Sequence, residues 1–353
     1  MLEINKYKVT IHLSIRNAVK QIDEGGIGFC VCVDDEDKVI GVISDGDFRR
    51  AVLNGVPLNE NVDKIINRNF KYLLKNYTKK DVKDIFTDTV AQHIPVLDDG
   101  KLIDIITERS FFGIERKKNK RVLNNHVVIM AGGKGNRLDP FTRILPKPLI
   151  PIGNDPVIKV IMDKFRKFGM NDFYISLNEK GRMVKAYFHD HDLGYRIEYI
   201  EEDKPLGTAG ALKCLDGKMD GPFFVSNCDI IIHADYVSIF DFHKKGGYDL
   251  TLVGSMQQYT IPYGICDIDR GGVLKGIREK PEYDFLVNTG LYLLKQAILQ
   301  YIPENEYFDM TDLIKKIQDN GLKVGVFPVS EKAWINVGQW RDYKKMMNEL
   351  SPD

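Results

Sequence analysis

This 353-residue sequence lacks a net charge, a membrane-spanning apolar run and an N-terminal signal core. Its formal net charge is zero, so no overall field draws it to nucleic acid or to an anionic membrane. The apolar runs are far shorter than a membrane span, and the first ten residues contain no apolar signal core. We therefore expect a cytoplasmic protein with no nucleic-acid and no membrane partner.

The chain is also poor in cysteine. It contains five cysteines, and their spacing in the sequence is not typical of a metal site. Cys30 and Cys32 share a face of a predicted strand, where a local pair is conceivable. We interpret them instead as small buried hydrophobic residues, which suits a reducing compartment.

The length is too great for one ordinary core, and 43% hydrophobic residues can fill more than one interior. A polar, basic stretch at 115–125 separates two differently patterned regions. No aromatic residues are interleaved with these charges to stack on bases, so the stretch is typical of a solvated connector. The predicted domains are 1–118 and 126–353, joined by a linker at 119–125.

The first region contains an internal repeat of a strand, an acidic turn, a second strand and a polar helix start. One copy covers residues 29–47 and the other covers residues 93–109. Amphipathic stretches at 14–24 and 80–86 precede the two copies. This pattern predicts a pair of similar α+β units.

The repeat resembles a tandem pair of cystathionine-β-synthase (CBS) domains, a regulatory module that commonly binds adenine nucleotides. The family's ribose-binding element is a Ser or Thr followed three residues later by Asp. The first copy supplies Ser44 and Asp47, whereas the second supplies Thr107 with Ser110 in the place of the Asp. The resemblance implies at most one complete adenine-nucleotide site. Ser44 and Thr107 are also good helix N-caps, with Asp47 favouring a first helical turn, and the two interpretations remain open.

A glycine loop opens the second region. The apolar run 127–130 predicts a buried strand, and Gly132, Gly133 and Gly135 follow it directly. Without Cβ atoms, such a loop can place its N–H groups against an anion, and Arg137 and Lys147 add positive charge. No Lys-Ser/Thr pair follows as in a P-loop, and the third glycine of the dinucleotide fingerprint is missing. The stretch therefore predicts a different kind of polyphosphate clamp.

The whole string 131–149, with Pro-Lys-Pro at 146–148, resembles the signature of the sugar-nucleotide pyrophosphorylases. These nucleotidyltransferases include mannose-1-phosphate guanylyltransferase and glucose-1-phosphate thymidylyltransferase. The resemblance implies that Arg137 stabilises pyrophosphate and that Lys147 binds the α-phosphate or the sugar phosphate. It also implies that the nucleotide is bound by Ala131, Gly132, Gly133, Gly135 and Asn136.

From residue 126 onward, predicted strands and helices alternate, with strands at 127–130, 172–177, 196–200 and 223–226. This alternation predicts an α/β fold with a mostly parallel, doubly wound, Rossmann-like sheet. Active sites in such sheets lie outside the carboxyl ends of the strands. The glycine loop, the 205–212 segment and Asp229 all follow predicted strands.

In the resembled family, the 205–212 segment lines the nucleobase pocket, which implies roles for Gly207, Thr208, Ala209 and Gly210. A helix starting at 208–214, with Thr208 as its cap, is the simpler interpretation. Asp229 corresponds to an Asp that holds a divalent metal, and Mg²⁺ takes carboxylate and phosphate oxygens together.

Three later motifs have counterparts in the family's sugar site. They imply that the sugar phosphate and sugar are bound by Gly264, Glu279, Lys280, Asn288 and Thr289. The last motif, 334–338, departs from the family pattern, because Asn336 stands where a second metal-binding Asp is expected. Asn336 can still coordinate Mg²⁺ but brings no charge, and Asp309 or Asp342 is a possible compensating ligand.

The resemblance implies that a nucleoside triphosphate and a sugar 1-phosphate give a nucleotide sugar and pyrophosphate. The attacking oxygen is already anionic, so no general base is needed, and positioning and electrostatics carry the catalysis. We expect GTP as the triphosphate, with UTP, dTTP and CTP as alternatives. A degenerate transferase that only senses nucleotides is a second hypothesis. A CBS pair serving only for dimerisation is a third, and a homo-oligomer is expected from the resemblance.

Overall fold

The computed structural model describes residues 4–89, 91–112, 121–133, 135, 138–178, 180–191, 193–338 and 343–344. The chain divides into two compact units. The first unit comprises residues 1–118 and 257–285, and the second comprises residues 119–256 and 286–353. Among the described residues, no helix combines the length and apolar character needed to cross a bilayer.

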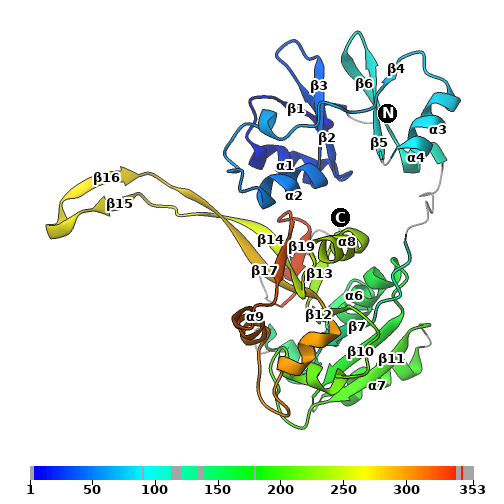
Figure 1. Cartoon of the computed structure of the whole chain (residues 1–353), viewed down its shortest axis with the longest axis vertical. Coiled ribbons are helices and arrows are strands. Elements are labelled where there is room, and N and C mark those ends of the chain that lie inside the picture. Colours follow the sequence, from blue (N-terminus) through cyan, green and yellow to red (C-terminus); the bar gives the residue numbers. More distant parts are fainter. Residues whose placement is uncertain are drawn as a thin grey trace. The chain divides into compact units, whose positions relative to one another are not determined.

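The predicted repeat is present in the first unit as two similar three-stranded sheets (Figure 1). In each copy the first strand pairs parallel with the second, and the second pairs antiparallel with the third. The first copy consists of β1 (Lys8–Thr10), α1 (Ile15–Gly25), β2 (Phe29–Val33), β3 (Val39–Ser44) and α2 (Asp45–Leu53). The second copy consists of β4 (Leu73–Leu74), α3 (Lys79–Asp88), β5 (His93–Asp98), β6 (Lys101–Thr107) and α4 (Glu108–Phe112).

Helix α1 forms where the amphipathic pattern predicted it. Ser14 caps its N-terminus by accepting a hydrogen bond from the Asn17 N–H, and Gly26 ends it in the left-handed conformation at φ 73°. Its apolar face is buried, as expected from the spacing, and consists of Ile15, Ala18, Val19 and Ile22. Side chains from both copies then share one core, formed in part by Phe29, Val31, Leu97, Leu102 and Ile105. The two copies therefore pack as one body.

A two-stranded hairpin belongs to the same unit. Strands β15 (Ile265–Ile268) and β16 (Leu274–Arg278) pair antiparallel with each other. They are connected to the second unit by two long strands, β14 (Leu250–Thr260) and β17 (Glu282–Leu294), which run across the unit boundary.

The second unit is built on a seven-stranded sheet in the order β11-β10-β7-β12-β17-β14-β18 (Figure 1). Strand β7 pairs parallel with both β10 and β12, and β10 pairs parallel with β11. Strand β17 runs antiparallel to β12, so the sheet is mostly parallel, as predicted. The remaining strands of this sheet are β7 (Val127–Met130), β10 (Asp172–Leu177), β11 (Arg196–Glu201), β12 (Phe223–Asn227) and β18 (Val324–Val329).

Both faces of the sheet are covered, which explains the nearly continuous apolar strands. Val127 and Ile129 of β7 point into one core, and Val128 and Met130 point into the other. The first core is closed by α6 (Val157–Arg166), α7 (Gly181–Asp190) and α8 (Tyr236–Gly246). The second is closed by the 3₁₀ helices η5 (Gly210–Leu215) and η7 (Gln296–Tyr301) and by α9 (Met310–Asp319). The doubly wound α/β prediction is confirmed.

Part of the predicted linker also packs on this unit. Leu123 is buried in the first core, and the Leu123 N–H donates to the Phe168 carbonyl at 2.9 Å. Residues 119 and 120 lie outside the described residues. The domain boundaries 1–118, 119–125 and 126–353 stay a prediction.

Candidate active site

Four parallel strands end at the same edge of the sheet and supply the site. Gly132 follows β7, Ser176 lies near the end of β10, Glu202 follows β11, and Asp229 follows β12. The chain runs outward from β7 to β10 and β11, and then returns to place β12 on the other side of β7. This reversal creates the crevice in which α/β sheets bind their ligands.

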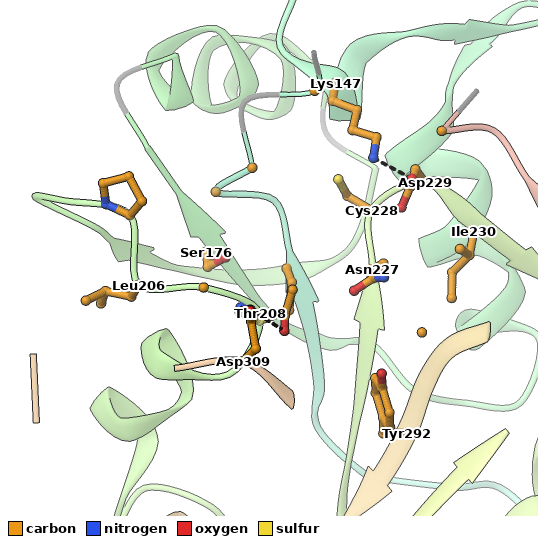
Figure 2. A pocket seen from close by; sticks show the side chains of 18 of the residues that line it. Lys147, Ser176, Leu206, Thr208, Asn227, Cys228, Asp229, Ile230, Tyr292 and Asp309 are labelled. Carbon is orange, nitrogen blue, oxygen red and sulfur yellow. Dashed lines mark hydrogen bonds and ion pairs between the residues drawn. The ribbon is translucent and has the colours of Figure 1, made fainter. Parts of the chain in front are cut away.

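A cavity of about 710 Å³ lies at this edge (Figure 2). Its size suits a small organic ligand such as a nucleotide. The predicted residues that line it are Gly132, Gly133, Gly135, Lys147, Gly207, Thr208, Asp229, Asn288, Thr289 and Asn336. Ser176, Glu202, Asn227, Tyr292, Tyr307 and Asp309 also line it. Ala131 and Ala209, which were predicted to bind nucleotide, are buried behind the wall; Gly210 is buried too.

Neighbouring strands hold the glycine loop in place. The Ala131 N–H donates to the Ser176 hydroxyl at 3.1 Å, and the Asn178 amide donates to the Gly132 carbonyl at 2.6 Å. Gly135 adopts φ 70°, where a side chain would be strained. A Cβ on Gly133 would meet no atom of the described residues beyond its chain neighbours within 4 Å, so a ligand can approach the backbone there. Asn136 and Arg137 lie outside the described residues, and their predicted roles stay predictions.

Lys147 and Asp229 form an ion pair inside the cavity (Figure 2). Lys147 opens the short 3₁₀ turn η4 (Lys147–Leu149), and the prolines on either side restrict the backbone. Only 18% of the Lys147 side chain and 14% of the Asp229 side chain are exposed. The fold therefore brings together a cation and a carboxylate that lie 82 residues apart in the chain, and their predicted roles in the reaction stay predictions.

Asn336 lies beside Asp229 because their strands pair. Strands β13 (Ile230–Ile232) and β19 (Trp334–Asn336) are antiparallel, and the Val337 N–H donates to the Asp229 carbonyl at 2.7 Å. A Cβ on Gly338 would collide with the Asp229 carboxylate and lie 2.9 Å from the Asn336 Oδ1, so both oxygens converge on one point. One carboxylate and one amide oxygen suit Mg²⁺, which completes its shell with water and phosphate. The described residues contain no cluster of three or more His, Cys, Asp or Glu at metal-binding distance.

Asp309 has a different role from the compensating metal ligand suggested by the sequence. Its Oδ1 accepts hydrogen bonds from the Thr208 N–H at 2.9 Å and from the Thr208 hydroxyl at 3.0 Å, and its Oδ2 accepts one from the Tyr307 hydroxyl at 3.0 Å (Figure 2). Burial pushes the Asp309 pKa up, but these hydrogen bonds outweigh it and hold the pKa below its usual range. Asp342, the other suggested ligand, lies outside the described residues.

The helix predicted at 208–214 is present as the 3₁₀ helix η5, which begins at Gly210, but Thr208 is not its cap. The Thr208 hydroxyl instead accepts from the Met310 N–H at the start of α9. A Cβ on Gly207 would lie 2.6 Å from the Phe308 carbonyl oxygen, so glycine allows the two segments to touch. The 206–210 loop is therefore held by residues about 100 positions later in the chain, which local sequence rules could not reveal.

Glu202 is the main site residue that the motif analysis did not single out. Its carboxylate packs so closely against Gly132 that a Cβ there would collide with it. Oε2 accepts from the Leu206 N–H at 3.1 Å, whereas the buried Oε1 has no hydrogen-bond partner among the described residues. Burial raises the Glu202 pKa, opposed by the Leu206 N–H and the Ser176 hydroxyl. Its position directly after β11 was the signal in the sequence that could have identified it.

The predicted sugar-site residues divide between the two units. Asn288 and Thr289 line the cavity, but the Thr289 hydroxyl already donates to the Val253 carbonyl at 2.8 Å within the sheet. Gly264, Glu279 and Lys280 lie on the hairpin of the first unit and do not line this cavity. A Cβ on Gly264 would lie 2.9 Å from the Glu279 carboxylate, so these two residues are neighbours. Their roles stay predictions.

In the CBS-like repeat, the helix-cap interpretation is realised at both positions. The Asp47 carboxylate accepts from the Ser44 N–H at 2.9 Å and from the Ser44 hydroxyl at 2.7 Å. In the second copy, the Ser110 N–H donates to the Thr107 hydroxyl, and the Thr107 N–H donates to the Ser110 hydroxyl, each at 3.0 Å. Nucleotide binding at Ser44, Asp47 and Thr107 stays a prediction.

Two family models match this chain. Residues 126–352 match the nucleotidyl transferase family model. Residues 4–54 and 62–115 each match the CBS domain model, so the tandem CBS pair recognised in the repeat is confirmed.

Curated relatives are similar over 61% of this chain. A probable mannose-1-phosphate guanylyltransferase from Oryza sativa subsp. japonica is 32% identical over 61% of this chain and 62% of its own length. A UTP–glucose-1-phosphate uridylyltransferase from Synechocystis is 28% identical over 61% of each chain. The chain thus spans about 62% of the length of the first of these relatives.

Among solved structures, HddC from Yersinia pseudotuberculosis is similar with a TM-score of 0.51 and 25% identity. The similarity covers 64% of this chain and all of HddC.

Proposed function

The chain belongs to the nucleotidyl transferase family, and from that premise we propose that it transfers the GMP group of GTP to a sugar 1-phosphate. An oxygen of the sugar phosphate forms a bond to the α-phosphorus, and the bond from the α-phosphorus to the bridging oxygen breaks. Pyrophosphate leaves with that electron pair. The observation that carries this proposal is the cavity lined by a glycine loop, the Lys147–Asp229 pair and Glu202.

The proposed chemistry needs positive charge and positioning, because both reactants are anions. The open backbone at Gly133 would receive the triphosphate, and Lys147 would neutralise charge near the α-phosphate. We propose Arg137, whose position is not described, as a second cation acting on pyrophosphate. No nucleophilic side chain or general base is required, because the attacking phosphate oxygen is already ionised.

Asp229 and Asn336 fit a divalent cation by their oxygen donors and by the convergence of those oxygens beside Gly338. When bound, Mg²⁺ would supply charge neutralisation between the phosphates. The protein would contribute the ligand positions, which the β13–β19 pairing fixes.

Guanine is the base that Glu202 would favour. A carboxylate only accepts hydrogen bonds, and guanine presents two adjacent donors, N1–H and N2–H₂. Uracil and thymine present one N–H between two carbonyl oxygens, which a carboxylate would repel. The relatives include both a guanylyltransferase and a uridylyltransferase, so the choice rests on this residue.

A substrate matrix tests the proposal. Purified full-length protein with Mg²⁺ should be given GTP, UTP, dTTP or CTP together with mannose, glucose or glucosamine 1-phosphate, and products identified by mass. The expected result is a GDP-sugar and pyrophosphate. Exclusive product formation with UTP or dTTP would overturn the choice of base. Absence of product in every combination, combined with GTP binding by calorimetry, would favour the degenerate nucleotide-binding alternative.

The KM for GTP should rise as the pH falls. Because the Glu202 pKa is raised, this rise should begin at a higher pH than it would if an exposed glutamate bound the base. Burial raises the Glu202 pKa, and the guanine-binding form is the ionised one, so protonation removes the acceptor. The measurement is the KM for GTP against pH at saturating sugar phosphate. A parallel profile with UTP is the control, because its base does not need the ionised carboxylate. Identical profiles for both nucleotides would contradict this role.

Asn336→Asp should lower the Mg²⁺ concentration needed for half-maximal activity, on the order of 10-fold, because ligand charge tunes affinity. The added carboxylate would lie beside Asp229, where the two oxygens converge. The measurement is initial rate against Mg²⁺ concentration for both proteins. An unchanged midpoint would show that position 336 does not hold the metal.

We propose adenine-nucleotide sensing for the CBS pair, with dimerisation as the alternative. Calorimetric titration of AMP, ATP and GTP into the full-length chain separates the two, with sedimentation measured in parallel. Binding abolished by Asp47→Ala would support sensing, and a homo-oligomer without binding would support dimerisation.

A further inference from the structure

An ion pair within the first unit joins the CBS pair to a strand that leads to the cavity. Arg16, in the first turn of α1, donates from Nη1 to Glu282 at 2.8 Å and from Nε to Asp284 at 3.2 Å, with Nη2 bonded to the second Asp284 oxygen. Only 17% of the Arg16 side chain and 21% of the Asp284 side chain are exposed. Two parallel guanidinium–carboxylate hydrogen bonds form one of the stronger and more directional ionic contacts in proteins.

A second contact comes from the same face of α1. Lys20 lies one turn after Arg16, and its Nζ donates to the Gln258 side chain at 2.9 Å. Gln258 is on β14, whereas Glu282 and Asp284 are on β17. One face of α1 therefore forms side-chain hydrogen bonds to both β14 and β17, the strands that lead to the hairpin.

Strand β17 runs without interruption from this contact to the cavity wall. Asp284 is four residues before Asn288, a span of about 13 Å along a strand. Side chains at 284 and 288 fall on the same face, because strand residues alternate. Asn288 lines the cavity and donates to the Tyr292 hydroxyl at 2.8 Å, so a shift of the strand would move a polar wall.

The start of α1 is also bonded to the segment that follows α2. The Arg16 N–H donates to the Leu58 carbonyl at 2.9 Å, and the Ile15 N–H donates to the Glu60 carbonyl at 2.8 Å. Residues 58 and 60 belong to the segment that follows α2, the helix capped by Ser44 and Asp47. Hydrogen bonds therefore join the segment after α2 to the start of α1, and Arg16 joins α1 to β17. Together with the chain that connects α2 to this segment, they form the kind of physical connection that coupling requires.

We propose that Arg16, a CBS residue, is a positioning residue for the sugar side of the transferase site. It acts through Asp284 and β17 on Asn288 and Thr289. This inference rests on the proposed function, because that function makes Asn288 and Thr289 sugar-binding residues. Its structural part, the restraint of β17 by Arg16, can be measured without any activity.

The first measurement is hydrogen exchange by mass spectrometry on the full-length protein. Arg16→Gln should increase exchange of the peptide covering 282–290 by several-fold, because the restraint on that segment is lost. Lys8→Gln is the matched control: Lys8 is also 17% exposed and ion-paired, with Asp37, in the same CBS copy. Equal exchange in Arg16→Gln and wild type would overturn the proposal, whether or not the protein is an enzyme.

The second measurement separates positioning from general destabilisation. With the most active pair in the substrate matrix, Arg16→Gln should raise the KM for the sugar 1-phosphate about 5-fold or more, the lower end of usual coupling between sites. The KM for GTP should change less than about 2-fold. Arg16→Lys, which keeps the charge but not the paired geometry, should be intermediate.

A double-mutant cycle assigns the effect to the ion pair. Asp284→Asn should reproduce the Arg16→Gln phenotype, and the double variant should be no worse than either single variant, because both remove the same interaction. Additive effects, or equal increases in both KM values, would overturn the positioning role. An inactive wild type would instead be a failure of the proposed function, and the exchange experiment would still decide this inference.

Discussion

Lys147→Ala should lower kcat for nucleotidyl transfer about 10²–10³-fold, the usual loss when one preorganised charge in a water-poor site is removed. The Lys147 side chain is largely buried and points into the cavity toward Asp229 (Figure 2). In that position its charge acts on the phosphates without rearrangement. The effect should appear mainly in kcat, because negative charge moves from the attacking oxygen toward the departing pyrophosphate in the transition state.

The control is Lys159→Ala. Lys159 is 19% exposed and paired with two aspartates, Asp155 and Asp163, but it does not line the cavity. Its variant should keep near wild-type kcat. Lys147→Gln loses the positive charge but can still donate a hydrogen bond to Asp229. Its kcat therefore distinguishes the effect of the lost charge from the effect of leaving the Asp229 carboxylate unpaired. Near-normal turnover of Lys147→Ala, with wild-type thermal unfolding in both variants, would remove Lys147 from the mechanism.

Local patterns were enough to predict the elements that carry the site. The bounds of β7 and β10 agree with the predicted strands at 127–130 and 172–177, because each is a short, mostly apolar run. Parallel topology then brings their carboxyl ends to one edge, so the positions of Gly132 and Asp229 followed from the order of elements. The cap hydrogen bonds at Ser44 and Thr107 could also be anticipated from the sequence, because a helix cap involves only the next three residues.

The contacts that could not be predicted all join residues far apart in the sequence. Thr208 was assigned to a helix cap because its local context allowed it, but Asp309 and Met310, about 100 residues later, determine its hydrogen bonds. Arg16 and Asp284 are separated by 268 positions. Such partners depend on which elements pack together, and neither periodicity nor turn chemistry contains that information.

The requirement for glycine at position 132 illustrates the same limit. The glycines were predicted to bind an anion, and this remains the interpretation for Gly133, where no other described residue would contact a Cβ. At Gly132 the cause within the protein is the Glu202 carboxylate, which occupies the space of a side chain. The close packing of Glu202 against Gly132 therefore fixes the position of the Glu202 side chain at the cavity wall.

Glu202→Gln should change the choice of nucleobase. A glutamine offers one acceptor and one donor, so it would lose one hydrogen bond to guanine and could bond the N3–H and a carbonyl oxygen of uracil. Since a paired contact to a base contributes about 1–3 kcal/mol of discrimination, the ratio of kcat/KM for GTP to that for UTP should fall roughly 5–150-fold. The measurement is this ratio with one sugar 1-phosphate, in wild type and variant.

Glu201→Gln is the matched control for that experiment. Glu201 is the adjacent residue and is also a glutamate, but it is exposed, paired with Lys185 and absent from the cavity wall. The two substitutions remove the same charge from neighbouring positions, so a general electrostatic effect would change both ratios alike. A change confined to Glu202→Gln therefore means direct contact with the base. If both ratios equal that of wild type, the base is selected elsewhere, and the loop that contains Gly207 and Thr208 and is held by Asp309 is then the next element of the cavity wall to test.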